Sequence, residues 1–297
     1  MPAERTIPDF VVVGAPKSGT TSLYYYLSHH PDIGVTRPKE LNFFIGSDPL
    51  SPSDPAVARW HRGWQWYRDH FDERCRSCGE VSPLYVGGAW RRIVMERMRR
   101  LLPDVKLILL VREPMARLRS HYLMAQRRPG SPPLTFTEFV QHPDFSEAVT
   151  HSDYGSQIAA ILEHFPRESL LVVESADLDH DRERTLSTIF GFLGVDRDVR
   201  LPAFQHRLYD RKQHRFPSPV GRRILNSRLV VAIKRHLPFV VYRAVTNALL
   251  LPFSIEDPDT SLDPAVEARL IERFRGEVAT ARTLTGLPLA SLDGAER

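Results

Sequence analysis

The sequence predicts a three-layer α/β/α fold, with helices on both faces of a central, mostly parallel sheet and a helical extension at the C-terminal end. Apolar runs without polar alternation occur three times, as expected for strands buried on both faces of a parallel sheet: 10–13, 107–111 and 170–173. Helical patterns lie between these runs. Strands that alternate with helices are typical of this fold class.

The first strand leads through a tight turn into a helix. Apolar residues recur at helical spacing after the turn until Pro31 ends the run. Pro114 suits the first position of a later helix, because the N–H group that proline lacks would be unpaired there. Gly194 suits the position just beyond a helix C-terminus. The further helices that we predict cover 90–102, 114–126, 153–164 and 182–193.

Length and composition indicate a single globular domain. The chain has 297 residues, of which 42% are hydrophobic and 26% charged, as in ordinary folded proteins. We expect a core over about 8–200, followed by a basic loop and a helical extension over about 203–297. The formal charge of +4 favours anionic ligands, but this excess is too small to indicate a nucleic-acid partner.

The sequence predicts neither a secretion signal nor a membrane span. Residues 1–9 lack the apolar stretch of a signal peptide, and two cysteines are too few for a disulfide framework, so we expect a cytoplasmic protein. The most apolar segment, 229–253, is interrupted by charges. We expect it to pack on the core or cover an acceptor; contact with a membrane surface is the alternative. Cys75 and Cys78 form a lone C-x-x-C pair that is free, bridged or metal-bound, and we predict no metal site.

The turn after the first strand has the features of a phosphate-binding loop. A strand, a tight loop and a helix N-terminus bring free N–H groups and the positive end of the helix dipole to one place. Gly14 and Gly19 keep the spacing of the loop that binds nucleoside triphosphates, but Thr20 stands where that loop has its lysine. The only lysine of this segment is Lys17, which lies inside the loop. The sequence therefore predicts a site for a phosphate-like anion and argues against ATP with its Mg²⁺.

Arg112 follows the central apolar strand and is a second candidate anion ligand. The carboxyl ends of parallel strands form the edge at which open α/β sheets bind ligands. The guanidinium fork suits phosphate, because it donates two charge-assisted hydrogen bonds. Ser120 lies nearly two helical turns beyond Pro114, where its hydroxyl could share the anion with Arg112. The alternative is a carboxylate partner for Arg112 and an exposed Ser120.

Lys39 and Glu40 precede a short apolar segment. A carboxylate beside a lysine and apolar residues could act as a general base for a hydroxyl acceptor, provided that it faces the cleft. The sequence leaves a solvated Lys39–Glu40 pair as the alternative.

In combination, these segments resemble the sulfotransferases that use 3′-phosphoadenosine 5′-phosphosulfate, in particular the bacterial and heparan-sulfate-type branch. The resemblance covers most of the chain, and the order of its motifs makes it specific. The motifs are VGAPKSGTTSL at 13–23, HPD at 30–32, KELNFF at 39–44, the segment 63–67, GEVSP at 79–83, LVREP at 110–114 with Ser120, Tyr154 with Gln157, and FLG at 192–194.

The resemblance implies a role for each part of the predicted site. It implies that the donor's 5′-phosphosulfate binds to Lys17, Ser18, Gly19, Thr20, Thr21 and Ser22. Lys17 would also steady the leaving bridging oxygen, while Arg112 and Ser120 would bind the 3′-phosphate. Glu40 would deprotonate the acceptor. Sulfuryl transfer of this kind needs no metal, because the moving group carries little charge and a lysine with main-chain dipoles can stabilise it.

The chain departs from the family pattern at Val81, where some heparan-type members carry a lysine. A second cation at the transferring group is then missing, or is supplied by Lys39 or by the late basic loop. In that loop Lys212 and Arg215 are candidate phosphate contacts, with a solvated basic turn as the alternative. The candidates for lining the acceptor cleft are Lys39, Tyr154 and Gln157, of which the last two share a helix face. Core packing is the alternative for Tyr154.

The resulting hypothesis is an enzyme that transfers a sulfuryl group from 3′-phosphoadenosine 5′-phosphosulfate to a hydroxyl or amine of a carbohydrate, lipid-linked or small-molecule acceptor. Two alternatives belong to other classes: a metal-dependent P-loop kinase, and a nucleotide-binding scaffold without catalytic activity. The sequence leaves the acceptor and the oligomeric state open.

Overall fold

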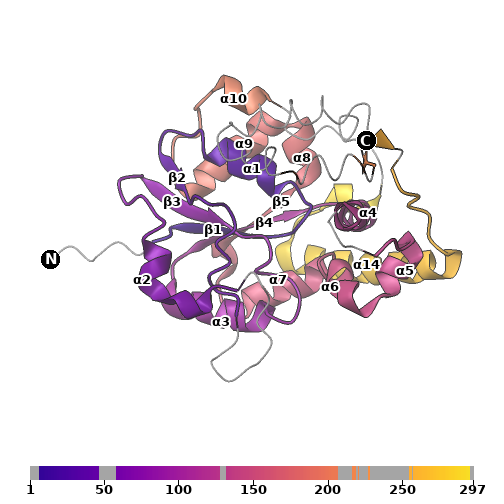
Figure 1. Ribbon diagram of the computed structural model, residues 1–297. Coiled ribbons are helices and arrows are strands. Elements are labelled where there is room, and N and C mark those ends of the chain that lie inside the picture. Colours follow the sequence, from indigo (N-terminus) through magenta and orange to yellow (C-terminus); the bar gives the residue numbers. More distant parts are fainter. Residues whose placement is uncertain are drawn as a thin grey trace.

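A five-stranded parallel sheet forms the centre of the structure. The computed structural model describes residues 7–46, 58–127, 132–206, 216–218, 220, 227, 254–255 and 257–294. The sheet has the order β2-β3-β1-β4-β5, and every pairing in it is parallel, as predicted (Figure 1). Its strands are β1 (Phe10–Gly14), β2 (Ile33–Val35), β3 (Ser77–Val81), β4 (Lys106–Val111) and β5 (Leu170–Glu174). A separate antiparallel pair consists of β6 (Phe216–Pro217) and β7 (Ser254–Ile255).

Helices cover both faces of this sheet, which confirms the predicted α/β/α layering (Figure 1). One face carries α1 (Thr20–Leu27), α8 (Ser175–His180) and α9 (Arg182–Leu193). The other face carries α3 (Arg91–Leu101), α7 (Tyr154–Leu162) and α14 (Pro264–Thr285). Alternate residues of β1 enter the two cores: Phe10 and Val12 pack toward α1 and α9, whereas Val11 and Val13 pack toward α3 and α7. This double burial explains why the strand shows no polar alternation.

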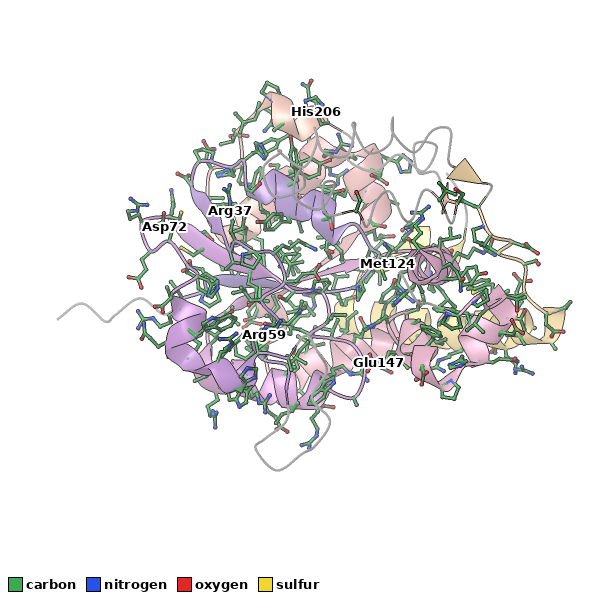
Figure 2. The ribbon with its side chains drawn as sticks, viewed as in Figure 1. Arg37, Arg59, Asp72, Met124, Glu147 and His206 are labelled. Carbon is green, nitrogen blue, oxygen red and sulfur yellow. The ribbon has the colours of Figure 1, made fainter. Side chains whose placement is uncertain are left out.

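The remaining helices lie around these layers. A third apolar cluster joins α4 to α5, α6 and the start of α14 beside the sheet (Figure 1). Figure 2 labels Met124 on α4, which follows the carboxyl end of β4. The bounds are α2 (Gly63–Arg68), α4 (Pro114–Gln126), α5 (Phe136–Gln141), α6 (Ser146–Thr150) and α10 (Pro202–Gln205). Single 3₁₀ turns occur at Trp60–Arg62, Pro143–Phe145, Arg167–Ser169 and Ala290–Asp293.

The predicted helix ends are confirmed at Pro114 and Gly194. Pro114 is the first residue of α4, and the Glu113 side chain caps this helix by accepting from the N–H groups of Met115 (2.7 Å) and Ala116 (2.5 Å). Gly194 ends α9 in the left-handed region at φ 79°, where a side chain would be strained.

Strands β2 and β3 escape the sequence prediction. β3 reads Ser-Cys-Gly-Glu-Val, which lacks an apolar run, yet all five of its residues are buried. Glu80 can lie inside because three hydroxyl groups hydrogen-bond its carboxylate. Pairing with β1 on one side and β2 on the other places β3 in the sheet.

The predicted domain boundaries stay a prediction. The basic loop at 207–215 lies outside the described residues, as does most of the segment 221–253. Within the described part of the chain, no helix has both the length and the apolar character that a bilayer span requires. Cys75 and Cys78 are not joined by a disulfide, and the Cys78 thiol donates to the Asp72 carbonyl at 2.8 Å.

Candidate functional site

The loop between β1 and α1, residues 14–19, presents N–H groups that have no acceptor within the described part of the chain. Gly19 and Lys17 both adopt the left-handed region, at φ 92° and φ 70°. Among the described residues, no oxygen accepts from the main-chain N–H of Lys17 or from those of residues 19–22. The Ser18 N–H closes the loop internally on the Ala15 carbonyl at 3.2 Å. Such a group of N–H donors at a helix N-terminus suits an anion.

The Lys17 ammonium lies among other positive charges. Its pKa is lowered to about 8, first by burial and then by the charges of Arg127, Arg112, Arg117 and Lys39. The largest contributions from described residues all come from burial and from positive charges. Cations that repel one another beside free N–H groups are stabilised by a bound polyanion, so the electrostatics agree with the loop geometry.

Arg112 lies against the loop, at the same edge of the sheet. Its Nη1 donates to the Lys17 carbonyl at 3.3 Å, and the Ala15 N–H donates to the Leu110 carbonyl at 2.8 Å. The strand end and the loop are therefore adjacent, as one nucleotide bound by both requires. Ser120, half-buried on α4, hydrogen-bonds no described residue through its hydroxyl.

Lys39 links the loop to Glu40. Its Nζ lies 2.5 Å from the Glu40 Oε1 and 3.4 Å from the Thr21 Oγ1, at the start of α1. The Glu40 side chain is 41% exposed and that of Lys39 is 17% exposed. The pair is therefore partly solvated, which agrees with the alternative of a solvated Lys39–Glu40 pair. It also lies beside the loop between β1 and α1.

A buried glutamate supports the Glu40 segment. Glu40 and Asn42 adopt the left-handed region, at φ 64° and φ 52°, which is unfavourable for residues other than glycine. Two bonds hold this backbone: Glu40 N–H to the Val81 carbonyl at 3.1 Å, and Asn42 N–H to the Ser82 Oγ at 3.2 Å. Ser82 in turn donates to the buried Glu80.

The Glu80 carboxylate accepts from two further hydroxyls, those of Tyr67 (2.5 Å) and Tyr85 (2.7 Å). Burial raises the pKa of Glu80, and the hydroxyl bonds oppose this effect. Sequence reasoning included Glu80 only as part of a motif. Its role in holding the Glu40 backbone depends on contacts between β3 and the segment after β2.

Tyr154 and Gln157 lie inside the protein. Both are fully buried. The Tyr154 hydroxyl donates to the Arg112 carbonyl at 2.8 Å and accepts from the Arg112 N–H at 3.1 Å, while Gln157 donates to the Thr150 carbonyl at 3.2 Å. This placement supports the alternative that Tyr154 packs in the core. Its hydroxyl bonds the Arg112 backbone there. Lys212 and Arg215 lie outside the described residues.

Sequence reasoning missed two arginines near Lys17. Arg117 is fully buried behind the loop, and Arg127 at the end of α4 forms an ion pair with Asp257 at 3.7 Å. In the sequence Arg117 belongs to the predicted helix 114–126 and Arg127 directly follows it. The only feature of the sequence that could have indicated them is the number of arginines that follow Arg112. This number does not tell which of these arginines lie near the loop.

Comparison with known proteins identifies the relatives of this chain, although no protein-family model matches it. The membrane-associated sulfotransferase kil1 of Dictyostelium discoideum is 33% identical over 139 residues, which are 44% of this chain and 26% of that protein. The mouse heparan sulfate glucosamine 3-O-sulfotransferase 3B1 is 28% identical over 203 residues, which are 66% of this chain and 48% of that protein. The chain is thus similar to sulfotransferases over part of its length. It spans less than half the length of these two curated relatives.

Solved sulfotransferases share the fold. A sulfotransferase from Alicyclobacillus acidocaldarius superposes with a TM-score of 0.65 over 98% of this chain and 99% of that one, at 23% identity. The mouse sulfotransferase SULT7A1 complexed with PAP superposes with a TM-score of 0.51 over 95% of this chain and 90% of that one, at 15% identity. These structures confirm the predicted fold, and the curated sulfotransferases confirm the resemblance that the motifs indicated.

Proposed function

We propose that this chain is a sulfotransferase that moves the sulfuryl group of 3′-phosphoadenosine 5′-phosphosulfate to a hydroxyl or amine of a carbohydrate, lipid-linked or small-molecule acceptor. The observation that carries the proposal is that Lys17, Arg112 and the N–H groups of residues 19–22, which have no acceptor among the residues that the structure describes, lie together at one edge of the sheet. These groups are cationic or hydrogen-bond donors. They fit a nucleotide with negative charge at both its 5′ and 3′ positions.

The donor would be held at its two ends. Lys17 and the N–H groups at the start of α1 bind the 5′-phosphosulfate, with Ser18, Thr20 and Thr21 in the same turn. Arg112 and Ser120 bind the 3′-phosphate. These two anchors orient the sulfur for attack from the acceptor side, and fixing the reacting atoms in this way lowers the barrier to transfer.

The chemical step breaks one bond and forms one. As the acceptor oxygen or nitrogen bonds to sulfur, its proton passes to the Glu40 carboxylate. The bond between sulfur and the bridging phosphate oxygen breaks, and its electron pair stays on that oxygen. The protonated Lys17 donates to this oxygen as negative charge develops there. Lys39 lies between Glu40 and Thr21, so it is placed to act as the second cation that Val81 does not supply.

Neither alternative function is favoured by a specific observation. The kinase would need a lysine at the position of Thr20, and the relatives are named as sulfotransferases. The scaffold would need no general base, yet Glu40 lies beside the loop through Lys39. The acceptor class is taken from the relatives, whose names include a heparan sulfate glucosamine enzyme. A cytoplasmic location stays a prediction.

Two measurements on the full chain test the proposal. Calorimetry compares adenosine 3′,5′-bisphosphate with ATP, and a transfer assay offers labelled donor to a panel of hydroxyl and amine acceptors. We expect tight binding of the bisphosphate, weaker binding of ATP, and label on at least one acceptor. Preferential binding and turnover of ATP would instead establish the kinase. Bisphosphate binding without transfer to any acceptor would support the scaffold.

Arg112→Met tests the assignment of the 3′-phosphate. We expect the bisphosphate to bind roughly 10- to 100-fold more weakly, because a charge-assisted contact is lost, while adenosine 5′-phosphate loses little. Equal losses for the two nucleotides would remove Arg112 from the 3′ position. Arg184→Met is the matched control, since its side chain is 85% exposed and lies on α9.

A further inference from the structure

Arg117 has a fully buried guanidinium that donates to three neutral oxygens. Its Nε donates to the Ser152 Oγ at 2.5 Å, its Nη1 to the Pro16 carbonyl at 3.3 Å, and its Nη2 to the Ala148 carbonyl. Nη1 also lies 3.4 Å from the His121 Nδ1. No carboxylate of the described residues forms an ion pair with it. A buried charge without such a pair is costly, which suggests a function beyond packing.

The contact with Pro16 sets the direction of a loop amide. The Pro16–Lys17 peptide is trans, so its carbonyl and its N–H point to opposite sides. With the carbonyl held by Arg117, the Lys17 N–H points away from the buried guanidinium, and it has no acceptor among the described residues. Arg112 holds the next carbonyl, that of Lys17, at 3.3 Å. Two guanidinium groups therefore fix consecutive carbonyls of the loop.

The backbone of Lys17 needs such support. Its φ of 70° lies in the left-handed region, which costs a residue with a side chain roughly 1–2 kcal/mol. A strained conformation persists only where its surroundings fix it. Arg117 donates to the carbonyl of the preceding residue, Pro16, and Arg112 donates to the carbonyl of Lys17 itself.

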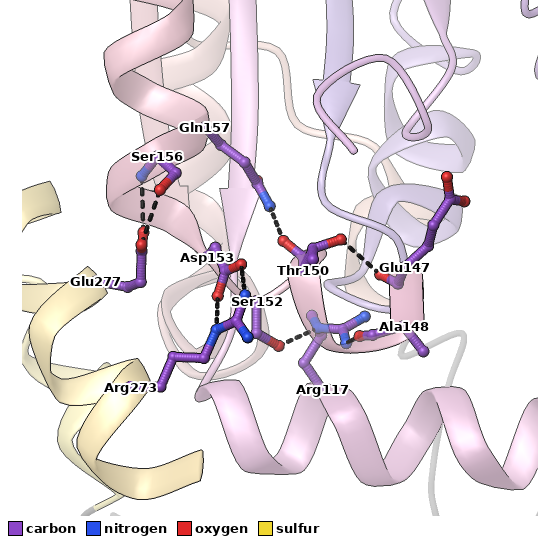
Figure 3. A network of polar contacts seen from close by, with 10 residues as sticks. All are labelled: Arg117, Glu147, Ala148, Thr150, Ser152, Asp153, Ser156, Gln157, Arg273 and Glu277. Carbon is purple, nitrogen blue, oxygen red and sulfur yellow. Dashed lines mark hydrogen bonds and ion pairs between the residues drawn. The ribbon is translucent and has the colours of Figure 1, made fainter. Parts of the chain in front are cut away.

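Arg117 also connects the loop to the helices behind it. Ser152 accepts from Arg117 and donates to the Pro114 carbonyl at 3.2 Å, at the start of α4. Figure 3 shows Arg117 between Ser152 and Ala148. Asp153, which follows Ser152 in the chain, accepts from Arg273 of α14. The loop is thus tied to α4, α6 and the start of α7 through one side chain.

We propose that Arg117 is a positioning residue for the anion site: its buried fork fixes the Pro16–Lys17 peptide, so that Lys17 and the loop amides are oriented before the donor binds. The proposal rests on the proposed function, because it assumes that the loop binds the 5′ end of the donor. Arg117 does not touch the donor. It acts through the loop and through its charge beside Lys17, whose pKa it helps to lower.

Calorimetry of the full chain with adenosine 3′,5′-bisphosphate, repeated across the pH range, tests this role. Arg117→Met removes both the fork and the charge. We expect the affinity for the bisphosphate to fall by roughly tenfold or more. Because a positive neighbour of Lys17 is lost, the pKa of Lys17 rises, and the pH above which the affinity declines should also rise. Arg117→Lys retains a charge but not the three-way fork. It should lose affinity without this pH shift.

Arg167→Met is the matched control. Arg167 bonds the carbonyls of Leu170 (2.7 Å) and Thr285 (3.0 Å) on another part of the fold. We expect this variant to lose thermal stability and to keep the wild-type affinity. A merely structural Arg117 would behave in the same way, so folded Arg117→Met with affinity within twofold of the wild type overturns the proposal.

Ser152→Ala covers the case in which Arg117→Met does not fold. It keeps the guanidinium but removes the acceptor of its Nε, and we expect the affinity to fall by about three- to tenfold. Unchanged affinity in this variant would also overturn the proposal. Failure of the wild type itself to bind the bisphosphate is a different result, since it contradicts the proposed function before any variant is compared.

Discussion

The surroundings of Lys17 disfavour the protonated form of its side chain. Burial and the neighbouring positive charges lower its pKa to about 8, while an unpaired set of loop amides lies next to it. A bound polyanion would offset this repulsion, because it adds negative charge beside these cations. The repulsion among the cations thus favours the binding of an anion at this residue.

The affinity for adenosine 3′,5′-bisphosphate should depend on pH through Lys17. A bound anion should raise the pKa of Lys17 above about 8, so binding takes up a proton when the pH exceeds that value. We expect affinity to fall above that pH, by up to about tenfold per pH unit, and to vary little just below it. Calorimetry at several pH values measures this. In Lys17→Met the decline should disappear; its persistence would assign the titration to another group.

Glu40→Gln should suppress transfer without weakening donor binding. The amide keeps the size of the side chain but cannot accept the acceptor's proton. We expect kcat to fall by roughly 10²–10⁴-fold while the bisphosphate binds as to the wild type. Single-turnover rates with labelled donor and calorimetry measure the two quantities. Full activity at neutral pH would exclude Glu40 as the base.

Among the elements, α14 supports the site from outside the sheet. Arg273 on α14 donates to both oxygens of Asp153, at 3.0 Å and 2.6 Å, and Glu277 accepts from the N–H and hydroxyl of Ser156 at 2.7 Å and 2.8 Å (Figure 3). Asp153 and Ser156 lie at the start of α7, beside the residues that bond Arg117 and Arg112. The C-terminal helix is therefore part of the scaffold that holds the loop.

Arg273→Met should destabilise the fold. The Asp153 side chain is only 8% exposed, so losing its partner leaves a nearly buried carboxylate unpaired. Because the Arg273 side chain is 47% exposed, water offsets part of this cost, and we expect a loss of about 1–3 kcal/mol in the free energy of unfolding. Urea denaturation measures it. Arg275→Met on the same helix is the control, since its pair with Glu272 is exposed and should contribute less than about 0.5 kcal/mol.

At the scale of the whole molecule, the nucleotide should act as a stabilising ligand. Under the proposed function it would bridge the loop after β1 and the end of β4, two segments far apart in the chain. At a concentration of about 100 times Kd, binding adds about 2.7 kcal/mol to stability. For a chain of 297 residues, whose unfolding entropy is about 0.6 kcal/mol/K, that corresponds to a rise of about 4 °C in Tm. Thermal scans with and without the bisphosphate measure it. Lys17→Met should show a much smaller rise, and an equal rise would place the nucleotide elsewhere.

Local chemistry in the sequence accounts for the sheet strands at 10–13, 107–111 and 170–173, for the helix start at Pro114, and for the end at Gly194. In each case a few neighbouring residues decide the outcome, through burial on both faces, a missing N–H group or a left-handed turn. The turn between β1 and α1 belongs to this group as well, since strand, glycines and helix follow one another directly, while anion binding by this turn stays a prediction.

Tertiary structure alone decided which charges gather at that loop. Arg117 and Arg112 reach loop carbonyls that lie 101 and 95 residues earlier in the chain, and Tyr154 was taken into the core to bond the Arg112 backbone. β3 became a strand despite its glutamate, because Tyr67 and Tyr85 supply the hydroxyls that satisfy it. Such contacts depend on how distant segments pack, and no pattern within one segment encodes them. The sequence alone therefore determined the fold class and the loop, and packing determined how the loop is held.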